Sequence, residues 1–289
     1  MKIVVSPNPY RDKQFKNARQ ACSILREAGA EVALCLPFDV DKTFEIPHDL
    51  RFQDIQKEIK TADMLICFGG DGTILHSSKI ATEHNLPILG VNIGTMGFIA
   101  ELEAGEIELL RKIPKGDYTV EERTMLDVSV GNGRQTLFHE TALNDAVITK
   151  GAIARVVQLG IYCDGIEATS YSGDGVILCT PTGSTAYSLS VGGPVVAPQC
   201  ACLVLSPVAP HNLTMRPVVI PSSSDVRLKV HARHAEISIA TDNETCPIPE
   251  GAEFRVRLAS RRFFLAVPHN ISFYDTLRDK MMWGVDIRD

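Results

Sequence analysis

Short, uninterrupted apolar runs alternate with helix-spaced patterns through the first part of the chain. The runs lie at residues 2–5, 32–36, 64–68 and 87–92. Apolar side chains recur at helical spacing between the first two runs, and Gly29 then stands where a helix commonly ends. Strands without polar alternation are typical of a parallel sheet covered by helices on both faces. The pattern therefore predicts an α/β domain over residues 1–120.

From about residue 120 the apolar pattern becomes alternating. Residues 126–130, 226–230 and 254–258 each alternate apolar with polar side chains, which is typical of antiparallel strands with one face in water. Residues 184–191 are the exception, and their pattern predicts a short helix. No low-complexity linker separates the two patterns. We therefore predict a β-rich second domain over residues 121–262, joined directly to the first.

The charge distribution limits the kinds of partner. The chain has 29 Lys and Arg against 35 Asp and Glu, a net charge of -6, and no block of basic residues. This disfavours a general binder of nucleic acid or of anionic membranes. An anionic ligand would instead be held locally by backbone N–H groups, a few cationic side chains or a metal.

The cysteines and the apolar runs indicate the compartment. No run approaches the roughly 18 apolar residues that a membrane span needs, and the first residues lack the pattern of a signal peptide, so we expect neither. The 8 cysteines include no Cys-x-x-Cys pair, and several lie inside apolar runs. We therefore expect reduced, mostly buried cysteines in a cytoplasmic protein without a structural zinc site.

The first motif that could take part in a reaction is Gly69-Gly70-Asp71-Gly72-Thr73, where an apolar strand is followed by a helix. Glycines and exposed N–H groups at a helix start suit phosphate oxygens, so Gly69, Gly70, Gly72 and Thr73 are candidates for a phosphate-donor loop. A carboxylate repels phosphate unless a cation intervenes or it faces the nucleophile. Asp71 therefore suits a proton acceptor in phosphoryl transfer to a hydroxyl. In the alternative interpretation, Asp71 merely caps the helix.

The second motif follows another apolar strand. Residues 173–194 read GDGVILCTPTGSTAYSLSVGGP, in which a strand leads into a turn rich in hydroxyl groups. Such a cluster suits ribose hydroxyls, a carboxamide or phosphate, and Tyr187 adds an aromatic face for a base. The alternative is a cap by Ser184 with Tyr187 in the core, although this leaves the many small polar groups unexplained.

The third motif is Asn144-Asp145, at the start of an apolar run. An amide and a carboxylate side by side can hold the two vicinal hydroxyls of a ribose through complementary donors and acceptors. Taken alone, the dipeptide is more simply explained as a turn, because both residue types favour turns.

At these three places together the sequence resembles the NAD kinase family. The Gly-Gly-Asp-Gly-Thr string is shared with lipid kinases and has a near relative in phosphofructokinases, whereas residues 173–194 are far more specific to NAD kinases. Residues 216–221 and the tail at residues 273–280, which looks bacterial in type, add to the resemblance. The resemblance covers most of the chain from about residue 60.

The resemblance implies a phosphofructokinase-like α/β domain, a β-rich NAD-binding domain, and a final segment, residues 263–289, that returns to the first domain. It implies transfer of the γ-phosphoryl of ATP to the adenosine 2′-hydroxyl of NAD, giving NADP, with a divalent cation such as Mg²⁺ or Mn²⁺. It also implies a homodimer or homotetramer. The residues do not distinguish ATP from polyphosphate as donor, or NAD from NADH as acceptor.

Carried onto this sequence position by position, the resemblance makes Asp71 the catalytic residue. The positions that it assigns to NAD are Asp71, Gly72, His76, Asn144, Asp145, Arg155, Asp174, Thr185, Ala186, Tyr187, Ser190 and Ala209. No metal ligand is assigned to a protein side chain. Arg155 also has the simpler interpretation of a surface charge, and His76 that of a packed histidine.

Two residues depart from the family pattern. Asp145 stands where the family usually has Glu, which withdraws the carboxylate by about 1.5 Å on an unchanged backbone. Glu244 stands where a later turn often has Gln, and its charge would repel NAD phosphates, so we assign it no binding role.

Two rival functions share part of these features. A lipid kinase would share the Asp71 motif but should present an apolar, membrane-facing patch. A non-catalytic NAD sensor would keep the ribose contacts and tolerate loss of Asp71, so the intact motif argues against it.

Overall fold

The structure is a computed structural model that describes residues 1–94, 97–133, 135–151, 156–232, 236–242, 244–269 and 271–284. Contacts divide the chain into two compact units. The first unit combines Met1–Glu122 with Phe263–Asp289, and the second is Arg123–Arg262. Two strands, β6 (Thr119–Gly131) and β17 (Glu253–Val267), carry the chain from one unit into the other.

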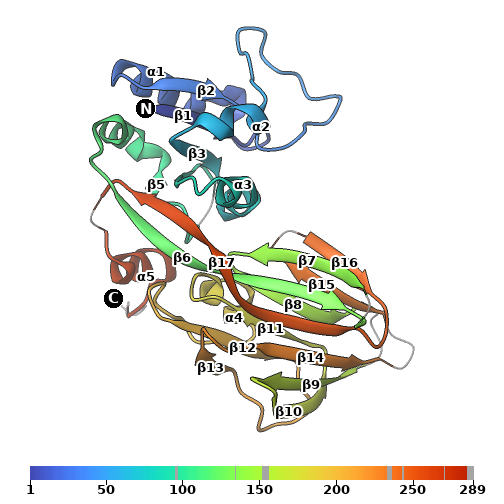
Figure 1. Cartoon of the computed structure of the whole chain (residues 1–289). Helices are drawn as coiled ribbons and strands as arrows, with labels where there is room; N and C mark the ends of the chain where they lie inside the picture. The colour runs from blue at the N-terminus through green and yellow to red at the C-terminus, as the bar shows by residue number, and fades with distance from the viewer. Residues whose placement is uncertain are drawn as a thin grey trace. The chain divides into compact units, whose positions relative to one another are not determined.

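A parallel sheet forms the centre of the first unit (Figure 1). Its order is β2-β1-β3-β4-β5, and the end of β17 pairs with β4 at Leu265 and Ile88. The strands are β1 (Lys2–Pro7), β2 (Glu31–Leu34), β3 (Met64–Gly69), β4 (Ile88–Asn92) and β5 (Leu102–Glu103). Every residue of β3 and β4 is buried, which explains why these strands read as continuous apolar runs.

Helices cover both faces of this sheet. On one face, α1 (Lys16–Glu27) and the 3₁₀ helix η3 (Ala104–Lys115) pack in one cluster with alternate residues of β1, β3 and β4. On the other face lies α3 (Asp71–Glu83), whose Ile74 packs so closely that a Cβ on Gly90 would lie 2.4 Å from its Cδ1 atom. The remaining helices are η1 (Lys13–Phe15), α2 (Ile55–Glu58), η2 (Ile59–Thr61) and α5 (Phe273–Met281).

The second unit contains two antiparallel sheets. The six-stranded sheet has the order β13-β12-β11-β8-β15-β16, with β13 (Val218–Pro221), β12 (Cys202–Val208), β11 (Gly175–Cys179), β8 (Asp145–Lys150), β15 (Ile237–Thr241) and β16 (Glu244–Ile248). The other sheet pairs β10 (Ile166–Gly173), β9 (Val157–Cys163), β14 (Val226–His231) and β17, and β6 pairs with β17 and with β7 (Thr136–Ala142). Side chains of both sheets, such as Leu228, Phe254, Leu178 and Ile239, share one core.

The segment after β11 differs from its prediction. Instead of one helix over residues 184–191, the chain forms a 3₁₀ turn, η4 (Thr182–Thr185), and a separate single turn, α4 (Tyr187–Ser190). Ala186 interrupts them with φ -95° and ψ -132°, outside the helical region. The single-helix prediction was therefore wrong, because local spacing does not reveal a break of this kind.

The predicted fold class is confirmed. A parallel sheet with flanking helices occupies the first unit, and two antiparallel sheets occupy the second. Strands β14 and β15 alternate as expected, whereas β11 and β12 are buried almost throughout. Gly29 has φ +92° directly after α1, as expected of a helix-ending glycine. Within the described residues, no helix combines the length and apolar character needed to cross a membrane.

Candidate active site

The Gly69–Thr73 segment is a tight strand-to-helix turn. Strand β3 ends at Gly69, Gly70 is the N-cap, and α3 begins at Asp71. A Cβ on Gly69 would lie 2.3 Å from Thr73 Oγ1, so the turn requires glycine there. The positive end of α3 and its backbone N–H groups are therefore presented at the carboxyl edge of the sheet.

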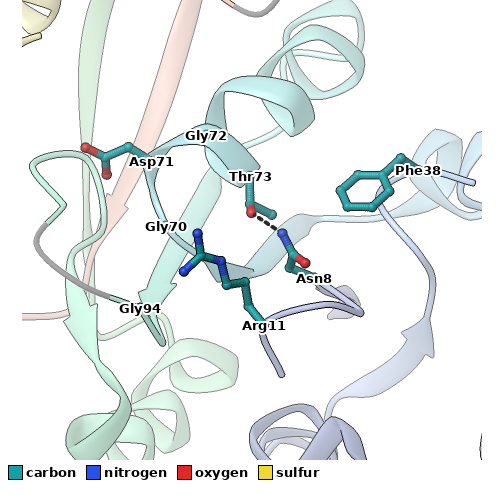
Figure 2. A pocket seen from close by; sticks show the side chains of 8 residues that line it. All are labelled: Asn8, Arg11, Phe38, Gly70, Asp71, Gly72, Thr73 and Gly94. Atoms are coloured by element: carbon teal, nitrogen blue, oxygen red, sulfur yellow. Dashed lines mark hydrogen bonds between the residues drawn. The ribbon is translucent and has the colours of Figure 1, made fainter. Parts of the chain in front are cut away.

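A cavity of about 400 Å³ lies against this turn (Figure 2). Its lining consists of Asn8, Arg11, Phe38, Gly70, Asp71, Gly72, Thr73 and Gly94. Asn8 follows β1 and is held beside β3 by its N–H, which donates to Phe68 O at 2.8 Å. Its side-chain amide donates to Thr73 Oγ1 at 2.9 Å. The end of β1 and the end of β3 thus meet in one pocket, as adjacent parallel strands do.

Arg11 places a cation at the same turn. Its guanidinium lies beside Gly70 and Gly94 in Figure 2, and Nη1 is 3.9 Å from where a Cβ on Gly94 would lie. The guanidinium forms no ion pair with any residue that the structure describes. Sequence reasoning missed Arg11 and Asn8; the available signal was the Asn8-Pro9-Tyr10-Arg11 string directly after the first apolar strand.

Asp71 points to the opposite side of the turn. Figure 2 shows its carboxylate directed away from Arg11 and from the Asn8–Thr73 pair. Its two oxygens accept the N–H groups of Phe98 at 2.7 Å and Ile99 at 3.1 Å. The alternative that Asp71 caps its own helix was wrong, because Gly70 is the N-cap and the carboxylate bonds outside the helix. Each carboxylate oxygen keeps a second lone pair for another donor.

His76 lies one helical turn along α3 and faces a second cavity of about 880 Å³. The side chain is exposed, its Nε2 is 3.0 Å from Pro37 O, and its ring meets the edge of Phe38 with centroids 5.5 Å apart. The ring thus packs against Phe38 and bonds to the backbone of Pro37, while the residue as a whole stays exposed. His76 and the glycine turn line different cavities. Phe38 lines both of them and so lies between the two sites.

In the second unit, Asn144 and Asp145 lie at the start of β8. Both are buried, at 8% and 7% exposure. The carboxylate of Asp242 lies beneath them and accepts the N–H groups of Leu143 at 2.7 Å, Asn144 at 3.0 Å and Asp145 at 3.3 Å. Asn144 Oδ1 is buried and has no hydrogen-bond partner among the described residues. A turn alone does not explain this buried amide oxygen, which is able to accept a hydrogen bond from a hydroxyl group.

The hydroxyl-rich turn after β11 meets this pair. Thr180 donates its N–H to Asn144 O at 2.9 Å, and its hydroxyl donates to Leu143 O at 2.6 Å. Gly183 packs so tightly that a Cβ there would lie 2.1 Å from Asn144 O. Thr185 and Ala186 are half-buried directly after this contact, and Ser190 is exposed. The second and third motifs therefore form one cluster at this end of β8 and β11.

Tyr187 is 44% exposed, so its ring is not a core side chain, and that alternative was wrong. The core position is taken instead by Ser188, whose hydroxyl is 2.8 Å from that of Ser206. Ser184 acts locally, since its Oγ accepts the N–H of Val196 at 3.0 Å and donates to Pro181 O at 2.7 Å. The exposed ring of Tyr187 is available to stack on a base.

Asp174 and Ala209 lie at the opposite end of β11. Asp174 precedes the strand and pairs with Lys150 at 2.7 Å, whereas Asp145 is opposite Cys179 at the far end. The length of β11 puts about 16 Å between the two ends. Ala209 has φ +42°, a left-handed conformation that is costly for a residue with a Cβ and is common at functional sites. The structure thus does not bring these two residues to the Asn144 cluster.

Arg155 lies outside the described residues. Glu244 is exposed at the start of β16, where it pairs with Thr241 of β15.

Burial, followed by the charge of the neighbouring Asp242, raises the pKa of Asp145 to about 7. In the unfolded chain this carboxyl titrates near about 3.9. Between those values the folded state binds the additional proton, so the unfolding free energy contributed by this group falls as the pH rises from about 4 to about 7.

Asp145→Asn is therefore expected to gain stability relative to the parent as the pH rises. The variant carries no titrating group at this position, so the stability difference should shift in its favour by about 2.5 kcal/mol between pH 5 and pH 8. Thermal melts of both proteins at several pH values measure the shift. A stability difference that stays constant with pH would show that Asp145 titrates normally.

Two family models match the chain. The model of the ATP-NAD kinase N-terminal domain matches residues 3–118, and that of the ATP-NAD kinase C-terminal domain matches residues 143–268. The curated NAD kinase of Bacteroides fragilis is 34% identical over 290 residues, which covers 100% of both chains. The NAD kinase of Geobacter sulfurreducens is 38% identical over 225 residues, covering 77% of this chain and 79% of that protein.

Two solved structures are similar in fold. A yeast NADH kinase in complex with NADH has a TM-score of 0.86 and 24% identity, covering 100% of this chain and 89% of that one. An NAD kinase from Archaeoglobus fulgidus in complex with ATP has a TM-score of 0.72 and 22% identity, covering 98% of both chains. At these identities the likeness concerns the fold alone.

Proposed function

The chain belongs to the ATP-NAD kinase family, and from that premise we propose which of its residues carry the reaction. The enzyme transfers the γ-phosphoryl of ATP to the adenosine 2′-hydroxyl of NAD and so makes NADP. The donor phosphates bind at the Gly69–Thr73 turn, and Asp71 serves the acceptor hydroxyl. The observation that carries this assignment is the turn itself, with a cation and a helix start on one side and a carboxylate on the other.

Asp71 orients the acceptor hydroxyl and accepts its proton. A ribose hydroxyl is far too weak an acid to ionise early, so its proton leaves only as the new P–O bond forms in a loose transition state. The two N–H groups of Phe98 and Ile99 fix the carboxylate and leave one lone pair on each oxygen for the hydroxyl. Alignment of hydroxyl and phosphate supplies the larger share of the acceleration.

The donor side of the turn neutralises the triphosphate. The start of α3 supplies N–H groups, and Arg11 supplies a guanidinium, which matches phosphate oxygens in a bidentate manner. The hydrogen bond from Asn8 to Thr73 Oγ1 fixes the side chain that forms the wall of the pocket. These groups hold the transferring phosphate between Arg11 and Asp71.

A divalent cation would be held in this pocket mainly by the ATP phosphates. Asp71 is the acidic residue of the described pocket lining, and the described residues hold no group of three or more metal-binding side chains. Mg²⁺ commonly keeps several waters and binds one or two carboxylates together with substrate phosphates, so this pocket fits a cation carried by the triphosphate. When bound, it would neutralise phosphate charge.

Asn144 and Asp145 hold the ribose of NAD. The buried, unpartnered Oδ1 of Asn144 supports this assignment, because a ribose hydroxyl is the donor that it lacks. Thr185, Ala186, Tyr187 and Ser190 line the adjacent surface, where the exposed ring of Tyr187 offers a stacking face for a base. Gly72 and His76 extend the NAD contacts in the first unit.

Asp174 and Ala209 complete the NAD site from a second copy of the chain. Their separation from Asn144 by the length of β11 supports this arrangement, together with the strained backbone of Ala209. We therefore propose a homodimer or homotetramer. All 8 cysteines are unpaired, which supports a reducing compartment, and we propose the cytoplasm.

Incubation of the purified chain with NAD, ATP and Mg²⁺ tests the activity, with product read by an NADP-specific dehydrogenase. Parallel reactions with NADH and with polyphosphate define the acceptor and the donor. NADP formation that requires the protein and ATP supports the proposal. Binding of NAD without any turnover would instead favour a sensor.

Arg11→Gln is expected to raise KM for ATP by about 10- to 100-fold, since a hydrogen bond to a charged group contributes about 1.5–3 kcal/mol. KM for NAD should stay near the parent value. Steady-state kinetics with each substrate varied separates the two effects. Arg26→Gln, an exposed charge in the last turn of α1, is the matched control. An unchanged KM for ATP, or an equal rise in the control, would remove Arg11 from the donor site.

A further inference from the structure

Side chains of the C-terminal segment of the first unit hydrogen-bond to backbone carbonyl oxygens of residues 97–101. The ammonium of Lys280, at the end of α5, donates to Gly97 O and, at 3.3 Å, to Ala100 O. His269 Nε2 lies 2.5 Å from Glu101 O and 3.5 Å from the Glu101 carboxylate. Lys280 and His269, which are far from this loop in sequence, therefore hold its two ends.

The same loop holds Asp71 on its amide side. The N–H groups of Phe98 and Ile99 donate to the Asp71 carboxylate. Gly97 O and the N–H of Phe98 belong to one peptide group, so a cation on that oxygen polarises the N–H toward the carboxylate. Hydrogen bonds in such chains strengthen one another. The order of contacts is therefore Lys280, then the Gly97–Phe98 peptide group, then Asp71.

Helix α5 is built to present Lys280 at a fixed point. Ser272 and Asp275 form a reciprocal capping box at its start, with Asp275 N–H donating to Ser272 Oγ at 3.2 Å. Leu277 is buried and anchors the helix in the first unit. Lys280 is itself half-buried, so its ammonium is held more closely than a solvated surface lysine.

Space around the carboxylate is also limited. A Cβ on Gly97 would lie 2.7 Å from Asp71 Oδ1, so the loop backbone lies directly against the carboxylate. A shift of this loop would therefore move Asp71 relative to the acceptor hydroxyl. Misplacement of a catalytic group by about 1 Å can cost about 100-fold in rate.

We propose that Lys280 is a positioning residue for Asp71, acting through the Gly97–Phe98 peptide group. This inference rests on the proposed role of Asp71. The C-terminal helix is then part of the catalytic apparatus of the first unit, although it lies about 200 residues from the glycine turn in sequence.

Steady-state kinetics of Lys280→Met in the full chain tests the proposal. We expect kcat to fall about 10-fold or more, while KM for NAD and for ATP stay within about 3-fold of the parent. Lys280→Arg, which keeps a cationic donor, should recover most of the rate. Arg278→Met is the matched control, since Arg278 lies on the same helix and pairs with Asp275. A parent-like kcat in Lys280→Met would overturn the proposal.

The double variant Asp71→Asn/Lys280→Met separates positioning from general structural support. If Lys280 acts through Asp71, its loss should add little to that of Asp71→Asn, because coupled residues are non-additive. Losses that multiply would overturn the proposal. If Asp71→Asn itself kept the parent rate, the proposed role of Asp71 would fail and this inference with it. A large loss in Asp71→Asn beside a normal Lys280→Met would reject only the inference.

Amide hydrogen exchange supplies a readout that does not depend on turnover. In Lys280→Met, the Phe98 and Ile99 amides should exchange faster, while amides of β4 keep the parent rate. If that variant does not fold, Lys280→Gln takes its place and retains a neutral donor. Unchanged exchange at both amides in a folded variant would contradict the proposal.

Discussion

Asp71→Asn is expected to lower kcat by about 10²- to 10⁴-fold, the usual scale of general acid–base catalysis, and to leave NAD binding close to the parent value. The substitution keeps the volume of the side chain and removes its charge. The amide can no longer accept a proton from the ribose hydroxyl. Its NH₂ group would also face the N–H of either Phe98 or Ile99, so one of the two orienting hydrogen bonds is lost.

The measurement is NADP formation under saturating substrates, accompanied by NAD binding by calorimetry. Asp49→Asn is the matched control, because it removes an exposed carboxylate of the same unit that pairs with Arg19. A parent-like kcat in Asp71→Asn would show that Asp71 is not the proton acceptor. A loss confined to KM for NAD would make it a binding residue only.

Gly183→Ala is expected to weaken NAD binding at least about 10-fold and to destabilise the protein by about 3 kcal/mol. A Cβ on this residue would lie 2.1 Å from the carbonyl oxygen of Asn144 and 2.5 Å from its carbonyl carbon. Both contacts are with backbone, so no side-chain rotation relieves them. The Asn144 backbone must move, and the ribose-binding pair moves with it.

Thermal melting and NAD titration of Gly183→Ala measure the two effects. Gly105→Ala is the control, since an added Cβ there meets nothing within 4 Å. Parent-like NAD affinity in a folded Gly183→Ala protein would show that the turn after β11 does not position the ribose-binding residues.

The parallel sheet could be predicted because strands that are buried on both faces consist almost entirely of apolar residues. Strands β3 and β4 are buried at every residue and read as unbroken apolar runs, so both their type and their pairing class follow from local pattern. The glycine turn was equally visible, since it combines a strand end with residues that permit a tight turn. Both ATP-NAD kinase family models match the chain, which favours the NAD kinase over the lipid kinase alternative.

Contacts between distant parts of the chain could not be predicted in the same way. Arg11 and Asn8 reach the glycine turn only because β1 lies beside β3, and a single sequence does not reveal which strands are neighbours. Asp242 supports the Asn144 backbone across about 98 residues of chain. Helical spacing likewise gave no sign of the break at Ala186.

The burial of Asp145 has a physical consequence that the sequence did not show. Asp145 is nearly buried beside Asp242, and burial raises its pKa to about 7. This carboxyl therefore titrates closer to neutral pH than an exposed aspartate, and only its protonated form can donate a hydrogen bond to a ribose oxygen. We expect the affinity for NAD to vary with pH in this range.

The position of the transferred phosphate tests the account most directly. ³¹P NMR of the products from NAD, ATP and Mg²⁺ identifies the oxygen that receives the phosphoryl group. The same spectrum compares the amount of ADP formed with the amount of new phosphomonoester. The account predicts one new phosphomonoester, on the adenosine 2′-hydroxyl, formed together with one ADP. Phosphate on another hydroxyl, or ATP consumed only to free phosphate, would contradict the assignment of Asp71 and the ribose-binding pair to this reaction.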